Sequence, residues 1–462
     1  MKIIVDTLKS RLVTDDRKLM SVMVDRYKYT IPGANYSTAA RRGRWDGKKR
    51  FIASNGTFRS GLLNTIIKDL GKVDVVPDIE YRTPTPTEEL SGYEIESFSY
   101  RAYQRYAIEQ FRSKKRLILQ SPTGSGKTLI LAGIVKSLQG KKGVVLFTGK
   151  QLLVQTYKFL VEKCGIPNIG MNYGEGFVYG DIMLTTSRSY EKIVDTHLED
   201  VDFLIVDEVH EFSKGKMSIA LIESFPNAQY RVGLTATMPP EAIPRLTLTG
   251  AFGDVVQVHT TKDLIDDGYL TKPIINMIEL PELKADDQDR SHQMTYRENY
   301  EEFVINNNYR NSLIRALVEE VKKKNKSAKI LILVSSIAHG QVLEDLLRKW
   351  KTNVAYLKGE DDISARYEAI DNFAQSEDNE VLIATKVLQT GVDISEITHF
   401  INARGLKSPI ATIQALGRSL RLHESKQSVQ VYDFIDKGRY LEAHSRKRLN
   451  TYKREKHEIK SI

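Results

Sequence analysis

Short apolar runs alternate with longer amphipathic stretches along most of the chain. Each run is bounded by glycine or polar positions, and a pattern of helical period fills the space before the next run. Continuous apolar runs of this length favour strands that are buried on both faces, as in a parallel sheet covered by helices. The predicted strands are residues 116–120, 143–147, 181–186, 203–207, 329–336, 354–359, 381–386, 399–404 and 429–435.

The strands fall into two successive series, which predict two lobes. Gly and Pro interrupt the pattern around residues 252–275, and we place the join between the lobes there. The stretch TPTPTEE (83–89) has no apolar periodicity, and its Thr-Pro steps favour extended backbone, so it is typical of a linker. The predicted domains are an N-terminal domain with its linker (1–90), a first lobe (91–270), a second lobe (271–436) and a basic C-terminal tail (437–462).

Composition places the chain among ordinary globular proteins. It has 462 residues, of which 41% are hydrophobic and 27% are charged. Its apolar runs are far shorter than the roughly 20 residues of a membrane span, and Asp6 and Lys9 interrupt the first of them. The single Cys164 can form neither an internal disulfide nor a cysteine cluster for a metal. We expect a soluble, cytoplasmic protein without a disulfide framework.

Basic charge is concentrated at the two ends of the chain. The formal net charge is +9, and residues 1–90 hold 17 basic and 11 acidic side chains. Residues 437–462 hold 9 basic and 3 acidic side chains, which leaves a slight acidic excess between the ends. Basic ends favour contact with nucleic acid or another polyanion. Basic ends that serve solubility alone are the alternative.

The stretch RRGRWDGKKRF (41–51) holds six Lys or Arg side chains. Its Asp-Gly pair predicts a two-residue hairpin, in which Arg44 would face Lys49 across the ladder. Like charges at such positions cost stability unless an anion relieves them, so we expect these cations and Lys48 to contact phosphate. Trp45 would pair with Lys48 on the other face, either as a core anchor or as a surface on which a base stacks.

A glycine-rich loop follows the predicted strand 116–120 and precedes an apolar helical stretch. This strand, loop and helix order is the context in which backbone amides surround phosphate oxygens at a helix N-terminus. Lys127 is placed to reach the β and γ phosphates, and Thr128 to hold magnesium. Ser121 replaces the first glycine of the strict phosphate-loop pattern. The candidate phosphate contacts are Thr123, Gly124, Ser125, Gly126, Lys127 and Thr128.

Two adjacent carboxylates follow the predicted strand 203–207 in the sequence FLIVDEVH. They lie at the carboxyl edge of the predicted sheet, where open α/β sheets bind ligands. Asp207 is the candidate magnesium ligand, and Glu208 is the candidate group that positions and deprotonates the attacking water. An acidic pair can also cap a helix, but 80 residues after Lys127 in a parallel-sheet pattern it favours catalysis.

The chain resembles the superfamily 2 helicases and translocases from residue 100 to residue 421, in the order of that family's motifs. TGSGKT resembles motif I, DEVH resembles motif II, and LTATMPP (234–240) resembles motif III. TGKQLLVQ (148–155) and LTTSRS (184–189) fall where the family contacts the nucleic-acid backbone. The resemblance implies nucleotide contacts at Arg101 and Gln104, coupling residues at Thr235, Thr237 and His210, and nucleic-acid contacts at Lys150, Gln155 and Thr185.

Two later segments resemble motifs V and VI of the same family, namely ATKVLQTGVDI (384–394) and QALGRSLR (414–421). The resemblance implies that Arg418 and Arg421 reach the γ-phosphate from the second lobe. A cation supplied in this way neutralises charge that develops in the transition state and typically contributes about 10³ to 10⁵ in rate. The other implied residues are Gly391, Asp393 and Gln414 at the nucleotide and Thr385 at the nucleic acid.

Three regions outside these motifs resemble the UvsW-type DNA helicases of bacteriophages. They are residues 43–51 with 59–70, residues 251–271, and the basic segment after motif VI. The resemblance implies an α/β fold with two tandem RecA-like lobes, a small N-terminal α+β domain that engages DNA, and a basic helical C-terminal tail. It also implies ATP and Mg²⁺ as cofactors and forked or four-way-junction DNA as the partner of a monomer.

We therefore expect an ATP-dependent DNA helicase that acts on branched intermediates of recombination, repair or replication. One alternative is an RNA helicase of the DExH kind, because the motif II box reads DEVH. Another is a nucleic-acid scaffold that binds ATP without turnover, which the presence of Lys127, Thr128 and Glu208 disfavours. A restriction-type translocase is a further alternative, but no nuclease pattern is visible in residues 1–90 or after residue 436.

Overall fold

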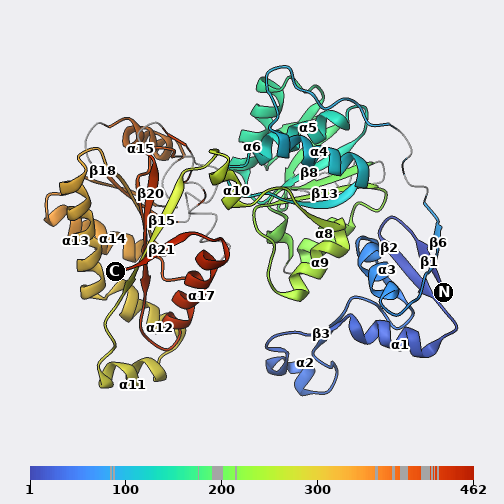
Figure 1. The fold of residues 1–462 in the computed structure, drawn as a ribbon, viewed down its shortest axis with the longest axis horizontal. Coiled ribbons are helices and arrows are strands. Elements are labelled where there is room, and N and C mark those ends of the chain that lie inside the picture. The colour runs from blue at the N-terminus through green and yellow to red at the C-terminus, as the bar shows by residue number, and fades with distance from the viewer. Residues whose placement is uncertain are drawn as a thin grey trace. The chain divides into compact units, whose positions relative to one another are not determined.

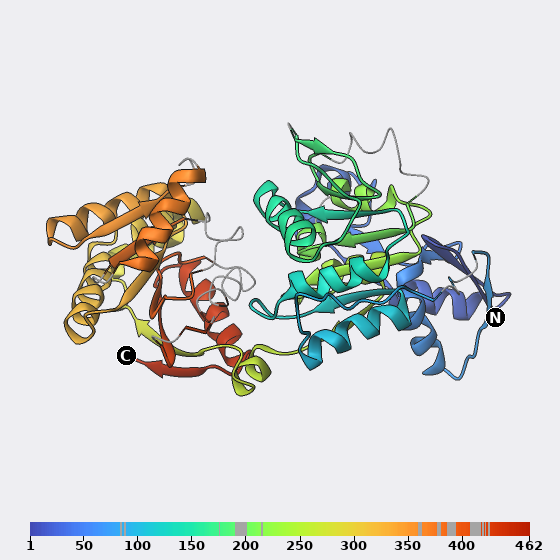
Figure 2. The same cartoon turned by 90° about the horizontal axis from the view of Figure 1, so that it is seen from above.

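A computed structural model describes most of the chain, and its strands run through the middle of two compact units (Figures 1 and 2). The first unit contains residues 1–122 and 126–259, and the second contains residues 123–125 and 260–462. None of the helices described is both long enough and apolar enough to cross a membrane. The described residues are 1–83, 86, 89–174, 176–189, 201–213, 216–358, 363–376, 380–385, 394–406, 417, 420, 422–423 and 426–462.

A small four-stranded sheet opens the first unit, in the strand order β5-β2-β1-β6. Alternate residues of β1 and β2, such as Ile3 and Leu12, pack against Met23, Ile66 and Leu70 of two helices. The elements are β1 (Lys2–Val5), β2 (Lys9–Val13), α1 (Arg17–Arg26), β3 (Lys28–Thr30), η1 (Ala34–Tyr36), α2 (Thr38–Arg41), β4 (Lys48–Arg50), β5 (Thr57–Arg59), η2 (Ser60–Leu62), α3 (Leu63–Gly71) and β6 (Asp78–Tyr81).

The predicted hairpin at residues 44–49 is wrong. Strand β4 pairs instead with β3, in an antiparallel ladder that sets Tyr29 opposite Lys49. The Asp46 carboxylate accepts hydrogen bonds from the Lys48 amide and from Arg50 ahead of β4, and residues 44–45 form no strand that could pair with β4. The chain between the two strands carries η1 and α2, so Arg44 does not face Lys49. The Asp-Gly turn signal concerns neighbouring residues only. The strand that pairs with β4 lies about 20 residues upstream, and the apolar pattern of the sequence does not specify the register between two such distant strands.

An eight-stranded sheet forms the rest of the first unit, in the order β10-β9-β11-β8-β12-β13-β7-β14. Every neighbouring pair is parallel except β10 with β9. The elements are α4 (Ala102–Lys114), β7 (Arg116–Gln120), α5 (Lys127–Ser137), β8 (Gly143–Phe147), α6 (Lys150–Lys158), η3 (Phe159–Lys163), β9 (Ile169–Asn172), β10 (Phe177–Val178), β11 (Ile182–Thr186), β12 (Phe203–Val206), η5 (Val209–Ser213), α8 (Lys216–Glu223), β13 (Tyr230–Thr235), α9 (Ala242–Phe252) and β14 (Asp254–Gln257).

The small N-terminal sheet is docked on helix α9 by close backbone packing and by polar bonds. An ideal Cβ at Gly61 would lie 2.2 Å from the Thr249 carbonyl oxygen, so only glycine permits this approach. Around it, Lys49 Nζ donates to Thr247 Oγ1 at 2.8 Å. Arg59 Nε donates to Glu223 Oε1 at 2.8 Å. Backbone contact of this kind joins the two sheets into one unit.

We expect Gly61→Ala to lower the free energy of unfolding by about 1–3 kcal/mol, the usual cost of overpacking a well-packed contact. The new methyl group would meet backbone atoms of Thr249, Gly250 and Gly253, none of which can rotate away. Urea denaturation followed by circular dichroism measures the change. Gly71→Ala is the matched control, because a Cβ at that helical glycine meets nothing within 4 Å. Equal stability of the two variants would show that the docking is loose.

A seven-stranded, wholly parallel sheet forms the second unit, in the order β17-β18-β16-β19-β20-β15-β21. Figure 1 shows α13 and α14 on one side of it and α17 on the other. The elements are α10 (Thr261–Asp266), β15 (Lys272–Glu279), α11 (Ala285–Gln293), α12 (Tyr296–Tyr300), η6 (Glu301–Ile305), α13 (Asn308–Lys324), β16 (Lys329–Leu333), α14 (Ile337–Lys349), β17 (Val354–Leu357), α15 (Ile363–Gln375), β18 (Glu380–Ala384), β19 (His399–Asn402), β20 (Ser428–Ile435), α17 (Leu441–Arg454) and β21 (Glu458–Ser461).

The predicted α/β class with two parallel-sheet lobes is confirmed. Each of the nine predicted strands is present, with bounds that differ by at most three residues at either end. The basic C-terminal segment is helical in α17, as expected, but it also adds β21 to the sheet beside β15. Its residues EIKS form no apolar run, and Ile459 alone of the four is partly buried, so the strand was not predicted.

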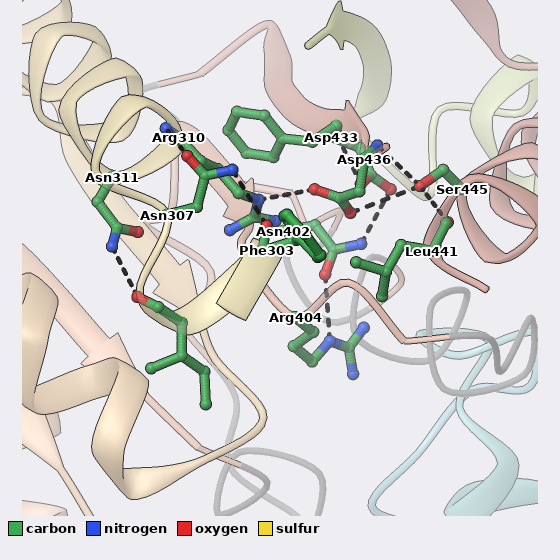
Figure 3. A network of polar contacts seen from close by, with 12 residues as sticks. Phe303, Asn307, Arg310, Asn311, Asn402, Arg404, Asp433, Asp436, Leu441 and Ser445 are labelled. Atoms are coloured by element: carbon green, nitrogen blue, oxygen red, sulfur yellow. Dashed lines mark hydrogen bonds and ion pairs between the residues drawn. The ribbon is translucent and has the colours of Figure 1, made fainter. Parts of the chain in front are cut away.

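A buried polar network surrounds the carboxyl end of β20 (Figure 3). Asp433 accepts hydrogen bonds from Asn402 Nδ2, Arg448 and the Tyr452 hydroxyl. Asp436 accepts from Arg310 Nε at 2.7 Å. Alternation along the strand explains the arrangement: Phe434 packs in the apolar core with α13 and α14, and Asp433 turns toward α17. The network ties the C-terminal helix to the centre of this sheet.

Candidate active site

The carboxyl ends of three neighbouring strands position the candidate nucleotide site. Strand β13 lies between β12 and β7, so the loops that follow these strands leave the same edge of the sheet. The register sets Thr235 opposite Gln120, the last residue before the glycine-rich loop. The Ser121 amide donates to the Thr235 carbonyl at 2.9 Å, which continues the ladder into the loop. Buried Ser121 therefore fills the first loop position without breaking the turn.

Two glycines shape the phosphate loop. Gly124 and Gly126 have φ values of 85° and 77°, a region that favours residues without a Cβ. A Cβ at Gly126 would lie 2.6 Å from Gln104 Nε2, so the side chain predicted to read the base lies against the loop. Helix α5 begins at Lys127, directly after Gly126. The loop thus presents a helix N-terminus to an anion, as the sequence predicted.

The loop lysine is held by its own loop. Lys127 Nζ donates to the carbonyl oxygens of Ser121 at 3.2 Å and of Pro122 at 3.3 Å. Thr128, at the next position, is exposed. These two bonds keep the Lys127 ammonium at the loop. A phosphate oxygen bound there can replace the carbonyl oxygens as the acceptor of its hydrogen bonds.

The two candidate catalytic carboxylates follow β12. The Asp207 amide donates to the Leu146 carbonyl, and Asp207 Oδ1 accepts from the Glu208 amide at 2.9 Å. Glu208 has φ 47°, unusual for a residue with a side chain and therefore a strained turn. Burial, followed by the charge of Glu208, raises the pKa of Asp207 to about 7, and the Lys127 charge opposes this shift. Carboxylate and hydroxyl oxygens are the donors that magnesium prefers, so Asp207 and Thr128 have the chemistry to hold this cation.

A chain of hydrogen bonds connects Glu208 to the third motif through His210. His210 Nδ1 lies 3.4 Å from Glu208 Oε2 and 3.0 Å from Thr235 Oγ1. The Thr235 hydroxyl donates to the Thr237 carbonyl at 3.1 Å and accepts from the Thr237 amide at 3.2 Å. Burial lowers the pKa of His210, but hydrogen bonds to Glu208 and Glu211 outweigh it and raise the pKa to about 9. The ring is therefore protonated at neutral pH.

The predicted base-reading segment begins helix α4. Gln104 is buried, and its Oε1 accepts from the Arg101 amide at 2.9 Å. Arg101 Nη1 donates to the Tyr103 hydroxyl at 3.0 Å. The Tyr103 ring stacks on His259 with 4.8 Å between centroids, a partner that the sequence did not indicate. These bonds hold Arg101, Tyr103 and Gln104 together, and Gln104 lies against Gly126 of the phosphate loop.

The predicted nucleic-acid contacts fall into two groups. Lys150 begins helix α6 with its ammonium 4.6 Å from the centre of the Tyr173 ring, and Gln155 is exposed on the same helix. Thr185 is fully buried, and its hydroxyl donates to the Asn172 carbonyl, so its side chain does not face solvent. Thr385 is also buried. The family pattern marks the segments, whereas burial decides which side chains of a segment are accessible.

The basic stretch at residues 41–51 likewise contains both accessible side chains and side chains that pack against the protein. Arg44 is exposed and Lys48 is partly exposed. Trp45 is half-buried, and its indole Nε1 donates to the Lys48 carbonyl at 3.1 Å, which favours the anchoring role. Lys49 bonds to Thr247 of α9, and burial, followed by the charge of Arg59, lowers its pKa. In this structure Lys49 joins the N-terminal domain to helix α9, and its phosphate contact stays a prediction.

The remaining candidate residues lie outside the described part of the chain. They are Gly391, Asp393, Gln414, Arg418 and Arg421, and their roles stay predictions. Sequence reasoning missed the cluster around Tyr173. The signal was present in NYGEGFVYG (172–180), where three aromatic residues are spaced by turn-forming glycines.

Comparison with known proteins adds two family matches. Residues 97–240 match the type III restriction enzyme res subunit family, and residues 312–423 match the helicase conserved C-terminal domain. The ATP-dependent DNA helicase uvsW of Enterobacteria phage T4 is 26% identical over 437 residues, covering 89% of this chain and 86% of the relative. A putative helicase of a Sulfolobus islandicus filamentous virus is 24% identical and covers 85% of this chain and 71% of the relative.

The fold likewise has solved counterparts. A fragment of a putative HsdR subunit of a type I restriction enzyme from Vibrio vulnificus aligns with a TM-score of 0.59 and 18% identity. The alignment covers 90% of this chain and 76% of that one, and at this identity it shows the fold alone. Together with the phosphate loop and the carboxylate pair on neighbouring strands, the two family matches identify the chain as an ATP-dependent helicase of superfamily 2.

Proposed function

We propose that this helicase translocates on DNA and unwinds or branch-migrates forked and junction DNA during recombination, repair or replication. One observation carries the proposal: the phosphate loop and the carboxylate pair are joined to motif III by the bonds through His210 and Thr235. A nucleotide-dependent change at Glu208 can therefore be transmitted beyond the nucleotide. Similarity to a phage DNA helicase over most of both chains supports DNA as the partner.

Within this proposal, each residue at the phosphate loop has a stated task. Lys127 holds the β and γ phosphates, and Glu208 orients and deprotonates the attacking water. Gln104 reads the base beside the loop. Magnesium, when bound through Asp207 and Thr128, would neutralise charge on the phosphates. Arg418 and Arg421 are proposed to supply the remaining cations from the second lobe.

The N-terminal domain is proposed to hold duplex DNA beside the motor. Arg44 and Lys48 are accessible and basic, as phosphate contacts must be. Lys49 and Arg59 bond to lobe 1, so the domain is fixed to the lobe that binds ATP. DNA bound at the domain would therefore keep its orientation toward that lobe through the ATPase cycle.

We expect Thr235→Val to lower DNA-stimulated ATP hydrolysis about tenfold while basal hydrolysis changes little. The substitution keeps the shape but removes the hydroxyl that accepts from charged His210, and such bonds contribute roughly 1.5–3 kcal/mol. Steady-state ATPase rates with and without DNA measure the effect. Thr352→Val is the matched control, because Thr352 is a buried threonine that lies outside the predicted motifs. Equal loss of basal and stimulated rates would argue against a coupling role.

An RNA helicase of the DExH kind is the second candidate, because the box at residues 207–210 reads DEVH. ATP hydrolysis with magnesium, measured with forked DNA, linear duplex DNA and structured RNA of equal length at one salt concentration, separates the two. Salt is fixed because phosphate contacts dominate affinity. The proposal predicts the strongest stimulation by forked DNA. Stronger stimulation by RNA would support the alternative, and the absence of ATP hydrolysis with every nucleic acid would favour an ATP-binding scaffold.

A further inference from the structure

One edge of lobe 1 carries three consecutive large apolar side chains that face solvent. Phe177 is 60% exposed, Val178 is 38% exposed and Tyr179 is 58% exposed. Within the described part of the chain, no other run of three consecutive large apolar residues is exposed in this way. Scattered exposed apolar residues are ordinary, whereas a contiguous group marks an interaction site.

These residues belong to a hairpin at the edge of the sheet. Strand β10 pairs with β9, setting Phe177 opposite Asn172 and Val178 opposite Met171. We call residues 169–174 and 176–180 the aromatic hairpin. Strand β10 is the edge strand of the sheet as far as the structure describes the chain. Phe177 and Val178, which point to opposite faces, are both exposed.

Glycines hold the aromatic hairpin in its shape. A Cβ at Gly180 would lie 2.2 Å from the Gly170 amide nitrogen, so the two arms cross with their backbones in contact. A Cβ at Gly176 would lie 2.3 Å from the Tyr173 ring, which therefore covers the turn. Packing of this kind fixes the backbone that carries Phe177 and Tyr179, and a preorganised backbone lowers the entropy cost of binding.

The aromatic hairpin adjoins two segments that the sequence assigns to the nucleic-acid backbone. Lys150, the first residue of α6, lies over the Tyr173 ring at 4.6 Å. Asn172 Nδ2 donates to the Ser189 carbonyl at 3.0 Å, at the end of the segment LTTSRS. Residues 141–189 contain six basic and three acidic side chains, which suits a polyanion.

We propose that the aromatic hairpin binds unpaired nucleobases of a DNA strand whose backbone follows Lys150, with Phe177 and Tyr179 as the stacking rings. This inference rests on the proposed function and names the element that contacts the single strand. Aromatic stacking beside a basic groove is the usual means by which proteins bind single strands without sequence preference. An apolar protein partner would not need the adjacent cations.

The test compares binding of full-length protein to a labelled oligothymidylate and to an abasic strand of the same length, by fluorescence anisotropy. We expect Phe177→Ala/Tyr179→Ala to weaken oligothymidylate binding about tenfold or more, since one stacked base contributes roughly fivefold or more. Binding of the abasic strand should not change. Phe177→Leu/Tyr179→Leu keeps apolar surface without rings and should show the same loss. Tyr309→Ala, on helix α13 and 56% exposed, is the matched control.

Two outcomes overturn the inference. Unchanged oligothymidylate affinity in both double variants would assign the surface to a protein partner or to a second copy of the chain. An equal loss on the abasic strand would show a contact with the backbone and not with bases. Wild-type ATP hydrolysis with and without oligothymidylate is measured in parallel. Absent stimulation there contradicts the proposed function itself, whereas stimulation with unchanged binding contradicts the hairpin's role alone.

Discussion

Lys127→Ala is expected to lower DNA-stimulated ATP hydrolysis about 10²-fold or more, since preorganised cations at a transferring phosphate contribute on this scale. Lys127 is the one side chain of the phosphate loop that carries a positive charge. In the described structure Lys127 donates hydrogen bonds only to two carbonyl oxygens of the loop, so alanine breaks no direct ion pair there. The loss should therefore appear in catalysis while the melting temperature stays close to that of the wild type.

The matched control for this variant is Lys114→Ala. Lys114 is exposed at the end of α4, next to the start of β7, and so lies at the opposite end of that strand from the loop. Both variants remove one positive charge, so non-specific weakening of DNA binding affects them alike. Steady-state phosphate release over a range of ATP concentrations gives kcat and KM for each. Hydrolysis by Lys127→Ala at the rate of Lys114→Ala would remove the phosphate loop from the account.

Asp433→Asn is expected to lower the free energy of unfolding by about 3–5 kcal/mol, the usual cost of breaking a buried charge network from one side. Asp433 and Asp436 are fully buried among Arg310, Arg404 and Arg448, so the network holds more cations than anions. Asp433 bonds to Arg448 through both carboxylate oxygens. Neutralising it leaves Asp436 as the one carboxylate of the network, with Arg310 and Arg448 both bonded to it.

Urea denaturation, followed by circular dichroism, measures this effect. Arg446→Ala on the same helix as Arg448 is the control, since its pair with Glu442 is exposed and such pairs contribute at most about 1 kcal/mol. The double variant Asp433→Asn/Arg448→Met should lose less than the sum of its single variants, because it removes the pair together. A cost below about 1 kcal/mol for Asp433→Asn would show that Asp433 does not hold Arg448 in place.

Much of the fold was predictable because parallel sheets buried on both faces give continuous apolar runs. The strands before the phosphate loop and before Asp207 are of this kind, and both lie in one sheet. The loop chemistry was predictable for a related reason: glycines, a lysine and a hydroxyl in that spacing serve few purposes other than phosphate binding.

Other features depended on contacts between distant parts of the chain. The ladder of β3 with β4 is set by pairing across the intervening helices, which a local turn signal at Asp46 does not specify. The bond from Lys49 to Thr247 spans 198 positions. The charge of Lys49 predicts a solvent-exposed side chain, whereas the fold places it at the interface between the N-terminal domain and helix α9. Thr185 lies in a motif segment but is buried, because β11 lies inside the sheet between β9 and β8 and is buried on both faces. Charge and motif patterns locate the segments that contact a ligand, and tertiary packing decides which side chains of those segments are accessible.

Strand displacement on branched DNA tests the central proposal most directly. The assay presents a labelled fork, a four-way junction and a linear duplex of equal length to the full chain, with ATP and magnesium at one salt concentration. We expect ATP-dependent separation or branch migration of the fork and junction, much slower separation of the linear duplex, and no product with Lys127→Ala. Equal rates on all three substrates, or product formation by Lys127→Ala, would contradict an ATP-driven enzyme of branched DNA.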